Sequence, residues 1–293
     1  MQTDTARTPT GYAHPDALVS TAWMEDHLAT STVRVVEVDI DTTLYGQGHV
    51  PGAVAMSWRR ELQDPIRRDI IARDAFERLM GTLGITPTDT VVVYGDHHNW
   101  FAAWAFWLLR LYGHPDVRVM DGGRALWLAE ERPLSLAVPR PRPTAYQAVA
   151  PQPEVRALRA DVERALRGAD HAGAGVRLVD VRTPREFSGE QLHNPDFPQE
   201  QALRGGHIPD AVNIPWELCV RPDGTFRSAA ELRALYGAAG VTLDRPVITY
   251  CNIGERSSHS WFVLSQLLGY PAVRNYDGSW AEWGNAIGLP IAR

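Results

Sequence analysis

The chain repeats itself, and this repetition limits the folds that it can adopt. Short segments of the first half recur in the second half, each 156 residues further along. The recurring pairs are Val91–Tyr94 with Val247–Tyr250, Gly113–Val117 with Gly269–Val273, and Asp121–Trp127 with Asp277–Trp283. Two copies are too few for a solenoid, in which stacked neighbours build a continuous core. The 293 residues therefore predict one duplicated domain of roughly 130 residues per copy.

Each copy alternates β-branched runs with segments of helical spacing. Short apolar runs rich in valine indicate strands, and apolar residues that recur every three or four positions indicate helices. The expected strands are 33–38, 91–94, 117–120, 176–181 and 247–250, and the expected helices are 19–28, 73–83 and 100–112. Strands that alternate with helices form parallel sheets. The predicted fold class is therefore α/β, with two tandem domains that are each a parallel sheet flanked by helices.

A proline-rich stretch separates the two copies. Six prolines fall within residues 133–153, a density that is typical of a linker. We expect an N-terminal domain over 17–132, a linker over 133–155 and a C-terminal domain over 156–293. Residues 1–16 are rich in threonine and proline, and we expect them to form a disordered or loosely attached arm.

Charge and hydropathy exclude several classes of partner. The net charge is −6 and the isoelectric point about 5.9, so a basic face for nucleic acid or for a membrane surface is not expected. The longest apolar run, Trp100–Leu109, is too short to span a bilayer. The first seven residues lack an apolar signal segment. These features predict a cytoplasmic protein.

Missing residue types narrow the chemistry. All 29 basic residues are arginine, which excludes a lysine Schiff base and a lysine-bearing phosphate loop. Only Cys219 and Cys251 are present, which excludes a disulfide scaffold and a four-cysteine zinc site. The adjacent His97 and His98 are expected to point in different directions, and no third ligand is evident. We therefore expect no metal and no cofactor.

Cys251 is the strongest candidate for chemistry. It follows the apolar strand 247–250, and a tight turn over Asn252–Arg256 leads directly into a helix. Ligands of open α/β sheets bind at this end of the strands. Backbone N–H groups of the turn and the helix N-terminus favour an anion, which should lower the thiol pKa. With the positive charge of Arg256, the pattern predicts a nucleophilic thiolate.

The repeat assigns the chemistry to one copy. The positions that match Cys251 and Arg256 in the first copy are occupied by Gly95 and Trp100. A glycine has no side chain with which to attack a substrate. Only the C-terminal domain is therefore expected to be catalytic.

Other polar residues near this turn leave alternatives open. Arg182 and Arg185 follow the strand 176–181 at the same sheet edge, and are candidates either for binding an anionic substrate or for solvated loop charges. Glu255 is expected either to pair with an arginine or to act as a hydrogen-bond acceptor. Cys219 is expected to be an inert buried thiol.

Three features together resemble a known family. Gly-His-Val-Pro at 48–51 is matched by Gly-His-Ile-Pro at 206–209, each copy ends with Asp-Gly followed by tryptophan five residues later, and only the second copy has the cysteine loop. The pattern resembles the two-domain rhodanese family of thiosulfate and mercaptopyruvate sulfurtransferases, over about Val19 to Leu289. The segment Cys251–Trp261 is most similar to the actinobacterial thiosulfate sulfurtransferase branch.

This resemblance implies a double displacement without a cofactor. Cys251 would take the outer sulfur of thiosulfate as a persulfide, release sulfite and pass the sulfur to a thiophilic acceptor such as cyanide, a small thiol or thioredoxin. The N–H groups of Asn252, Ile253, Gly254, Glu255 and Arg256 would hold the anionic persulfide. Asn252 stands where thiosulfate-preferring relatives often have a basic residue, and Glu186 where mercaptopyruvate-preferring ones often have arginine.

Three other functions compete with this expectation. A 3-mercaptopyruvate sulfurtransferase would use the same cysteine with a different donor. A dual-specificity phosphatase of similar fold has five residues between its cysteine and arginine, whereas four separate Cys251 from Arg256. A non-catalytic sulfur carrier or binding module would be expected to lack the nucleophile or to have a blocked loop.

Overall fold

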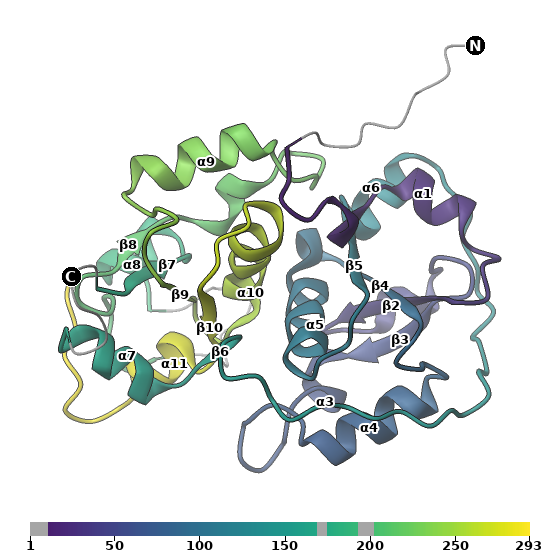
Figure 1. Cartoon of the computed structure of the whole chain (residues 1–293), viewed down its shortest axis with the longest axis horizontal. Coiled ribbons are helices and arrows are strands. Elements are labelled where there is room, and N and C mark those ends of the chain that lie inside the picture. The colour runs from purple at the N-terminus through teal and green to yellow at the C-terminus, as the bar shows by residue number, and fades with distance from the viewer. Residues whose placement is uncertain (1–10, 169–174, 193–201) are drawn as a thin grey trace. The chain divides into compact units, whose positions relative to one another are not determined.

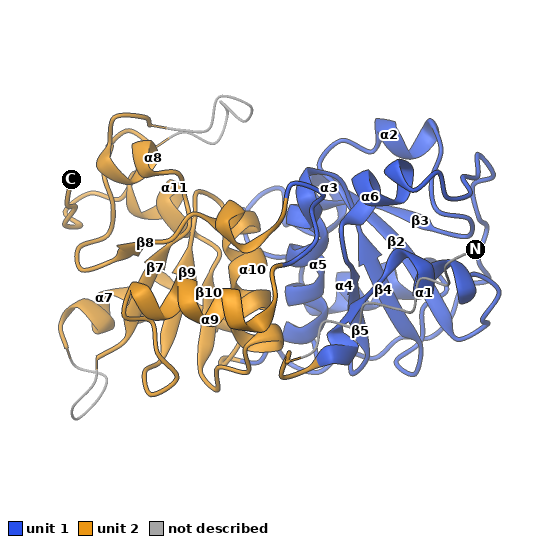
Figure 2. Cartoon of the chain, turned by 90° about the horizontal axis from the view of Figure 1, so that it is seen from above, with its two compact units in different colours: residues 1–9, 15–152, 222–226 blue, residues 10–14, 153–221, 227–293 orange. Residues whose placement is uncertain are grey.

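The computed structural model describes residues 11–168, 175–192 and 202–293. The described residues form two compact units, which Figure 2 shows in separate colours. Unit 1 consists of Pro15–Gln152 and Pro222–Phe226, and unit 2 consists of the described residues of 11–14, 153–221 and 227–293. Each unit has its own sheet and its own core.

Unit 1 contains a five-stranded sheet in which all pairings are parallel (Figure 1). The strands lie in the order β1-β5-β4-β2-β3. They are β1 (Leu18–Val19), β2 (Val33–Asp39), β3 (Val54–Ser57), β4 (Thr90–Tyr94) and β5 (Val117–Met120). The helices are η1 (Pro15–Ala17), α1 (Thr21–Asp26), α2 (Thr43–Gly46), α3 (Trp58–Glu61), α4 (Arg73–Thr82), η2 (His97–Asn99), α5 (Trp100–Leu111) and α6 (Gly123–Ala129).

Unit 2 repeats this architecture with the equivalent strand order, β6-β10-β9-β7-β8. Its parallel strands are β6 (Arg156–Ala157), β7 (Arg177–Asp180), β8 (Val212–Asn213), β9 (Val247–Tyr250) and β10 (Val273–Tyr276). Its helices are α7 (Arg159–Leu166), α8 (Pro184–Ser188), η4 (Trp216–Cys219), α9 (Ala229–Ala238), α10 (Glu255–Phe262), the π-helical turn η5 (Val263–Leu267) and α11 (Ser279–Trp283). The α/β fold and the duplication predicted from sequence are confirmed.

The central strands are apolar because helices cover both of their faces. Val91–Val93 of β4 are fully buried, and so are the four residues of β9. Continuous apolar runs of this kind are what parallel sheets require. The core of unit 1 joins Val92 to Trp127, and the core of unit 2 joins Ile248 to Trp283. Cys251 therefore follows the most deeply buried strand of unit 2.

The proline-rich stretch is not a free linker. Residues 133–152 belong to unit 1, and the division between the units falls after Gln152. The Thr144 N–H donates to the Gly81 carbonyl at 2.9 Å, and the buried Tyr146 packs edge-on against Phe76. Proline favours an extended chain, but the apolar surface of Tyr146 is stabilised by burial against α4. This burial extends the first unit beyond the boundary expected at residue 132.

The predicted N-terminal arm also differs from expectation where it is described. Residues 1–10 lie outside the described part of the chain. Tyr12 is buried, and its hydroxyl donates to the Arg227 carbonyl at 2.7 Å. Ala13 donates its N–H to the Leu267 carbonyl at 2.9 Å. Residues 11–14 are therefore packed against unit 2 rather than loosely attached.

Among the residues that the structure describes, no helix has the length and apolar character needed to cross a membrane.

Candidate active site

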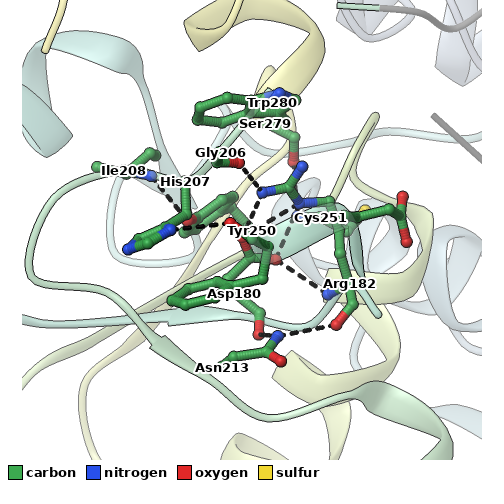
Figure 3. Close-up of polar contacts among 12 residues, drawn as sticks. Asp180, Arg182, Gly206, His207, Ile208, Asn213, Tyr250, Cys251, Ser279 and Trp280 are labelled. Atoms are coloured by element: carbon green, nitrogen blue, oxygen red, sulfur yellow. Dashed lines mark hydrogen bonds and ion pairs between the residues drawn. The ribbon is translucent and has the colours of Figure 1, made fainter. Parts of the chain in front are cut away.

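The backbone of Cys251 is fixed by the segment that opens α11. The Cys251 N–H donates to Ser279 Oγ at 3.1 Å, and the Trp280 N–H donates to the Cys251 carbonyl at 3.1 Å. Ser279 has a φ of +51°, which is uncommon for a residue other than glycine. Its hydroxyl also donates to the Tyr276 carbonyl at 2.7 Å. Two hydrogen bonds thus hold Ser279 in an uncommon backbone conformation next to Cys251. Figure 3 shows both residues.

The Cys251 thiol lies among hydrogen-bond donors and one facing carboxylate. The Gly254 N–H donates to Sγ at 3.1 Å, and the thiol donates to Glu255 Oε2 at 3.3 Å. Cys251 is fully buried, and Glu255 is 4% exposed. Glu255 and Arg256 are the first residues of α10, and the predicted turn covers residues 252–254 next to the sulfur atom. Asn252 and Ile253, the other predicted loop residues, are buried beside it.

Any side chain at position 254 would be strained. Its φ is +102°, and a Cβ atom built on it would lie 2.9 Å from both Cα and Cβ of Asp277. Such contacts are shorter than van der Waals separation, and L-residues avoid this backbone conformation. The glycine thereby allows its own N–H to face Sγ.

A buried polar network lies beneath the loop. The Gly254 carbonyl accepts hydrogen bonds from Ser257 Oγ at 3.1 Å, Ser258 Oγ at 2.7 Å and Asn275 Nδ2 at 3.3 Å, and also from the Ser258 N–H. All three side chains are fully buried. Sequence reasoning missed Ser257, Ser258 and Asn275. The available signal was the polar run at the start of α10, at positions where a helix beside a sheet is normally apolar.

Arg256 is held in a buried ion pair. Its Nη1 and Nη2 donate to the two carboxylate oxygens of Glu186 in α8 at 2.9 and 3.0 Å, and its Nε lies 3.4 Å from Glu255 Oε1. Glu186 is 1% and Arg256 2% exposed. Burial opposes ionisation of Glu186, but the Arg256 guanidinium outweighs it and holds the pKa of Glu186 at about 2. Glu186 is a site residue that sequence reasoning did not place.

The thiol is not activated in the way the sequence suggested. Burial and, to a lesser extent, the Glu255 carboxylate raise the pKa of Cys251 to about 11, against the opposing effects of Arg256 and of hydrogen bonds from Ser257. The expectation of a lowered thiol pKa is therefore wrong for this arrangement. The main reason is the burial of the thiol, to which the facing Glu255 carboxylate adds, while Arg256, paired with Glu186, opposes them only in part.

Arg182 is buried and has partners within unit 2. Its side chain is 1% exposed, and its Nη2 donates to Asp180 at 2.6 Å and to the Gly206 carbonyl at 2.8 Å, as Figure 3 shows. Its guanidinium also stacks 4.7 Å from the Trp280 ring. Arg185 is exposed, and its Nε lies 3.7 Å from Glu190. Arg182 is therefore engaged by groups of its own unit, and Arg185 is an exposed charge of α8; a substrate role for either residue stays a prediction.

In unit 2, the Gly-His-Ile-Pro segment at 206–209 is held by Arg182 and by Tyr250, and we call this group of contacts the clasp. The Ile208 N–H donates to the hydroxyl of Tyr250, the residue just before Cys251, at 3.1 Å. His207 stacks on Phe187 with ring centroids 3.6 Å apart. The clasp therefore fixes the carboxyl end of β9, and the motif supports the loop without touching the sulfur.

Unit 1 has the same clasp with a different arginine. The Val50 N–H donates to the Tyr94 hydroxyl at 3.0 Å, which matches the Ile208 contact. The Gly48 carbonyl, however, accepts from Arg124 of α6 at 2.6 Å, and Arg124 also pairs with Glu37 at 2.9 Å. The two units thus reach one geometry with arginines from different elements.

Unit 1 has no room for a nucleophile at the position that matches Cys251. A Cβ atom on Gly95 would lie 2.4 Å from the Val38 carbonyl oxygen and 2.8 Å from Asp39 Oδ1. The Gly95 N–H is occupied by Asn99 Oδ1 at 3.0 Å. The assignment of the cysteine loop to unit 2 alone therefore has a steric basis.

The second cysteine lies in a different environment. Cys219 is fully buried, with Sγ 3.4 Å from the Tyr236 hydroxyl. Burial raises the pKa of its thiol to about 12. These facts agree with the expectation of an inert thiol. Within residues 11–168, 175–192 and 202–293, no group of three or more His, Cys, Asp or Glu side chains is arranged to hold a metal ion.

Comparison with known proteins places the chain in a family. The family model described as Rhodanese-like domain matches residues 20–130 and 160–286. "Sulfur carrier protein TtuD" of Thermus thermophilus is 55% identical over 97% of this chain and 99% of its own length. "Putative thiosulfate sulfurtransferase" of Saccharopolyspora erythraea is 49% identical over 94% of this chain and 96% of its own length. The "Putative thiosulfate sulfurtransferase SseA" of Mycobacterium tuberculosis is 48% identical, over 99% and 95% respectively.

Solved structures agree with this placement. SseA from Escherichia coli, described with the rhodanese fold and mechanism of 3-mercaptopyruvate sulfotransferases, is similar with a TM-score of 0.77 and 26% identity, over 90% of this chain and 98% of that one. The anaerobic ergothioneine biosynthesis enzyme of Chlorobium limicola is similar with a TM-score of 0.83 and 25% identity, over 96% of this chain and 71% of that one. On the duplicated fold and these matches together, the chain belongs to the rhodanese family and carries two rhodanese-like domains.

Proposed function

We propose that the protein is a thiosulfate sulfurtransferase that carries sulfur on Cys251. The observation that carries the proposal is the position of the Cys251 sulfur at the end of β9, 3.1 Å from the donating Gly254 N–H. A sulfur atom that accepts a hydrogen bond from a backbone N–H at a strand-to-helix turn is suited to become a persulfide anion. Names of relatives that cover nearly the whole chain support the same reaction class.

The proposed reaction has two displacements. The Cys251 thiolate attacks the outer sulfur of thiosulfate, the sulfur–sulfur bond of thiosulfate breaks, and sulfite leaves with the bonding electron pair. The product is a Cys251 persulfide anion, which the loop N–H groups from Asn252 to Arg256 stabilise. A thiophilic acceptor then attacks the terminal sulfur, which restores the thiolate; with cyanide the product is thiocyanate.

The role proposed for Arg256 is limited by its ion pair. Its guanidinium already gives two hydrogen bonds to Glu186, so it supplies less free positive charge than an unpaired arginine. We propose that Arg256 orients the loop and contributes modestly to binding the leaving sulfite. Arg182 and Arg185 have no proposed part in catalysis.

Two alternatives differ in the donor or the acceptor. The likeness to the Escherichia coli SseA structure favours 3-mercaptopyruvate as a second candidate donor. The name of the Thermus thermophilus relative favours a protein partner that receives the sulfur. Both use the same persulfide, and a small thiol or thioredoxin as acceptor remains a prediction.

Intact-mass spectrometry tests the proposal. Wild type, Cys251→Ser and the matched control Cys219→Ser are incubated with thiosulfate and then with cyanide. We expect wild type and Cys219→Ser to gain one sulfur atom that cyanide removes as thiocyanate, and Cys251→Ser to gain none. Loading from 3-mercaptopyruvate but not from thiosulfate contradicts the proposed donor, and loading from neither contradicts the sulfurtransferase proposal.

A further inference from the structure

The Glu255 carboxylate lies between the thiol and a guanidinium. Its Oε2 accepts the hydrogen bond from the Cys251 thiol at 3.3 Å, and its Oε1 lies 3.4 Å from Arg256 Nε. A carboxylate that is 4% exposed has few water molecules to stabilise its charge, so its contacts within the protein matter for its ionisation. Of the two roles that the sequence left open for Glu255, the structure shows both.

The charges around the thiol do not balance. Arg256 faces two carboxylates, Glu186 and Glu255, so these three side chains together carry one net negative charge beside the sulfur. The nearby Arg182 is paired with Asp180, and Asp277, which lies against Gly254, is paired with Arg156. His259 is a further buried group on α10. A thiosulfate dianion therefore enters a site in which the positive charge of Arg256 is already balanced by a carboxylate.

Moving one proton generates the nucleophile without adding charge to the site. If the thiol proton passes to Glu255, the carboxylate becomes neutral and the sulfur becomes the nucleophile, with no change in the charge of the buried group. The contact that this transfer needs is already formed, and general acid–base groups act over such hydrogen bonds.

We propose that Glu255 is the catalytic proton acceptor for the Cys251 thiol, and that Arg256, held by Glu186, positions it. The proposal rests on the proposed sulfurtransferase function. In the loading step the proton moves from Sγ to Glu255 Oε2 while Sγ bonds to the outer sulfur of thiosulfate. The bond between the two sulfur atoms of thiosulfate breaks with its electron pair on sulfite, and Glu255 returns the proton to a sulfite oxygen. The products are the Cys251 persulfide anion, hydrogen sulfite and the Glu255 carboxylate.

A purely electrostatic role for Glu255 predicts the opposite effect of removing its charge. Burial and the Glu255 carboxylate both raise the pKa of Cys251, so Glu255→Gln should increase the fraction of thiolate at neutral pH. If Glu255 acts only through its charge, this variant reacts faster than wild type. If Glu255 accepts the proton, the variant reacts more slowly although its thiol is the stronger acid.

Alkylation of Cys251 by iodoacetamide separates the two roles without any sulfur donor. The rate is measured by peptide mass from about pH 6 to about pH 9 in wild type, Glu255→Gln, Glu255→Asp and the exposed control Glu217→Gln. Wild type and Glu217→Gln are expected to show a rate that stays level from about pH 6 to about pH 8, because the thiol and the carboxylate share one proton. Glu255→Gln is expected to lose about tenfold in rate for each pH unit lowered, and about 10²-fold at neutral pH.

The conservative variant Glu255→Asp is the control that shows whether a loss of rate comes from misfolding. Glu255→Asp keeps a carboxylate, so it should retain a level profile at a reduced rate. Equal pH slopes in wild type and Glu255→Gln, or faster alkylation of Glu255→Gln at every pH, would overturn the proposal. Thiosulfate loading of the same variants should follow the same order. Wild type that is alkylated as expected but gains no sulfur from thiosulfate contradicts the proposed function and leaves the assignment of Glu255 standing.

Discussion

The Arg256 guanidinium is bound by the Glu186 carboxylate through two hydrogen bonds of 2.9 and 3.0 Å, and both side chains are buried. The residue that the sequence suggests as the anion-binding cation is therefore committed to a partner 70 positions away. The pair links α8 to the cysteine loop. The pair therefore positions the cysteine loop, and its contribution to the free energy of unfolding can be measured.

Glu186→Gln tests this pair through stability. Removal of one partner leaves a buried charge less compensated, and we expect a loss of about 3 kcal/mol in the free energy of unfolding at neutral pH. Urea denaturation measures the loss. Glu190→Gln, which removes the exposed partner of Arg185, is the matched control and should cost less than about 1 kcal/mol.

The same variant should change how stability depends on pH. The pKa of Glu186 is lowered in the folded state, from an ordinary value of 4.5 to about 2. A group with a lowered folded pKa stabilises the protein above its unfolded pKa, and this stabilisation is lost as the pH falls through the folded value. Between about pH 4.5 and about pH 2, wild type should therefore lose stability more steeply than Glu186→Gln. Equal slopes in this window would show that the pair contributes nothing.

Gly254→Ala should disable sulfur loading. The added Cβ would lie 2.9 Å from Asp277, and alanine must adopt a φ near +102° or move the loop. We expect a cost of about 1–3 kcal/mol and a large fall in the rate of persulfide formation, because the Gly254 N–H no longer faces Sγ. Gly237→Ala is the control, since a Cβ at this helical position has no neighbour within 4 Å. Loading of Gly254→Ala at the wild-type rate would contradict this role.

Asn275→Ala should weaken the network beneath the loop. The change removes a donor to the Gly254 carbonyl and an acceptor for Ser257 Oγ, whose hydrogen bond is 2.7 Å long. Buried groups left without partners cost about 1–3 kcal/mol each. A double-mutant cycle with Ser258→Ala, which contacts both Asn275 and Gly254, measures their coupling. Additive effects within about 0.5 kcal/mol would mean that these side chains act independently.

Gly95→Cys should not create a second nucleophile in unit 1. The new Cβ meets the Val38 carbonyl oxygen at 2.4 Å, a backbone atom that cannot rotate away. We expect loss of stability and no additional sulfur gained from thiosulfate by intact mass. Gly46→Cys, at a position where a Cβ has no neighbour within 4 Å, controls for the effect of a new cysteine. A second transferable sulfur on Gly95→Cys would refute the steric explanation.

The features that could be predicted from sequence are local or repeated. Cys251 was identified because strand, turn and helix follow one another within a few residues, and the duplication showed that Gly95 replaces it in the other copy. The parallel sheets followed from the alternation of apolar runs. These patterns depend on neighbours in the chain, which a sequence displays directly.

The features that were missed depend on residues far apart in the chain. The residues around Arg256 in the sequence do not indicate that the Glu186 carboxylate will pair with it. The residues around Arg182 likewise do not indicate that it will bind the Gly206 carbonyl. The thiol pKa was misjudged for the same reason, since it depends on burial and on which charges are already paired. The location of the protein in the cytoplasm remains a prediction.

The different arginines of the two clasps limit how the active-site loop could be transferred from unit 2 to unit 1. Arg182 and Arg124 reach equivalent carbonyls from different elements, so the halves have diverged in their scaffolding as well as in their catalytic loops. Copying Cys251–Arg256 into positions 95–100 would import the loop without the carboxylate from α8 that anchors it. The chemistry of this site therefore depends on contacts between distant residues, and a graft of the loop would also have to carry the residues that hold it.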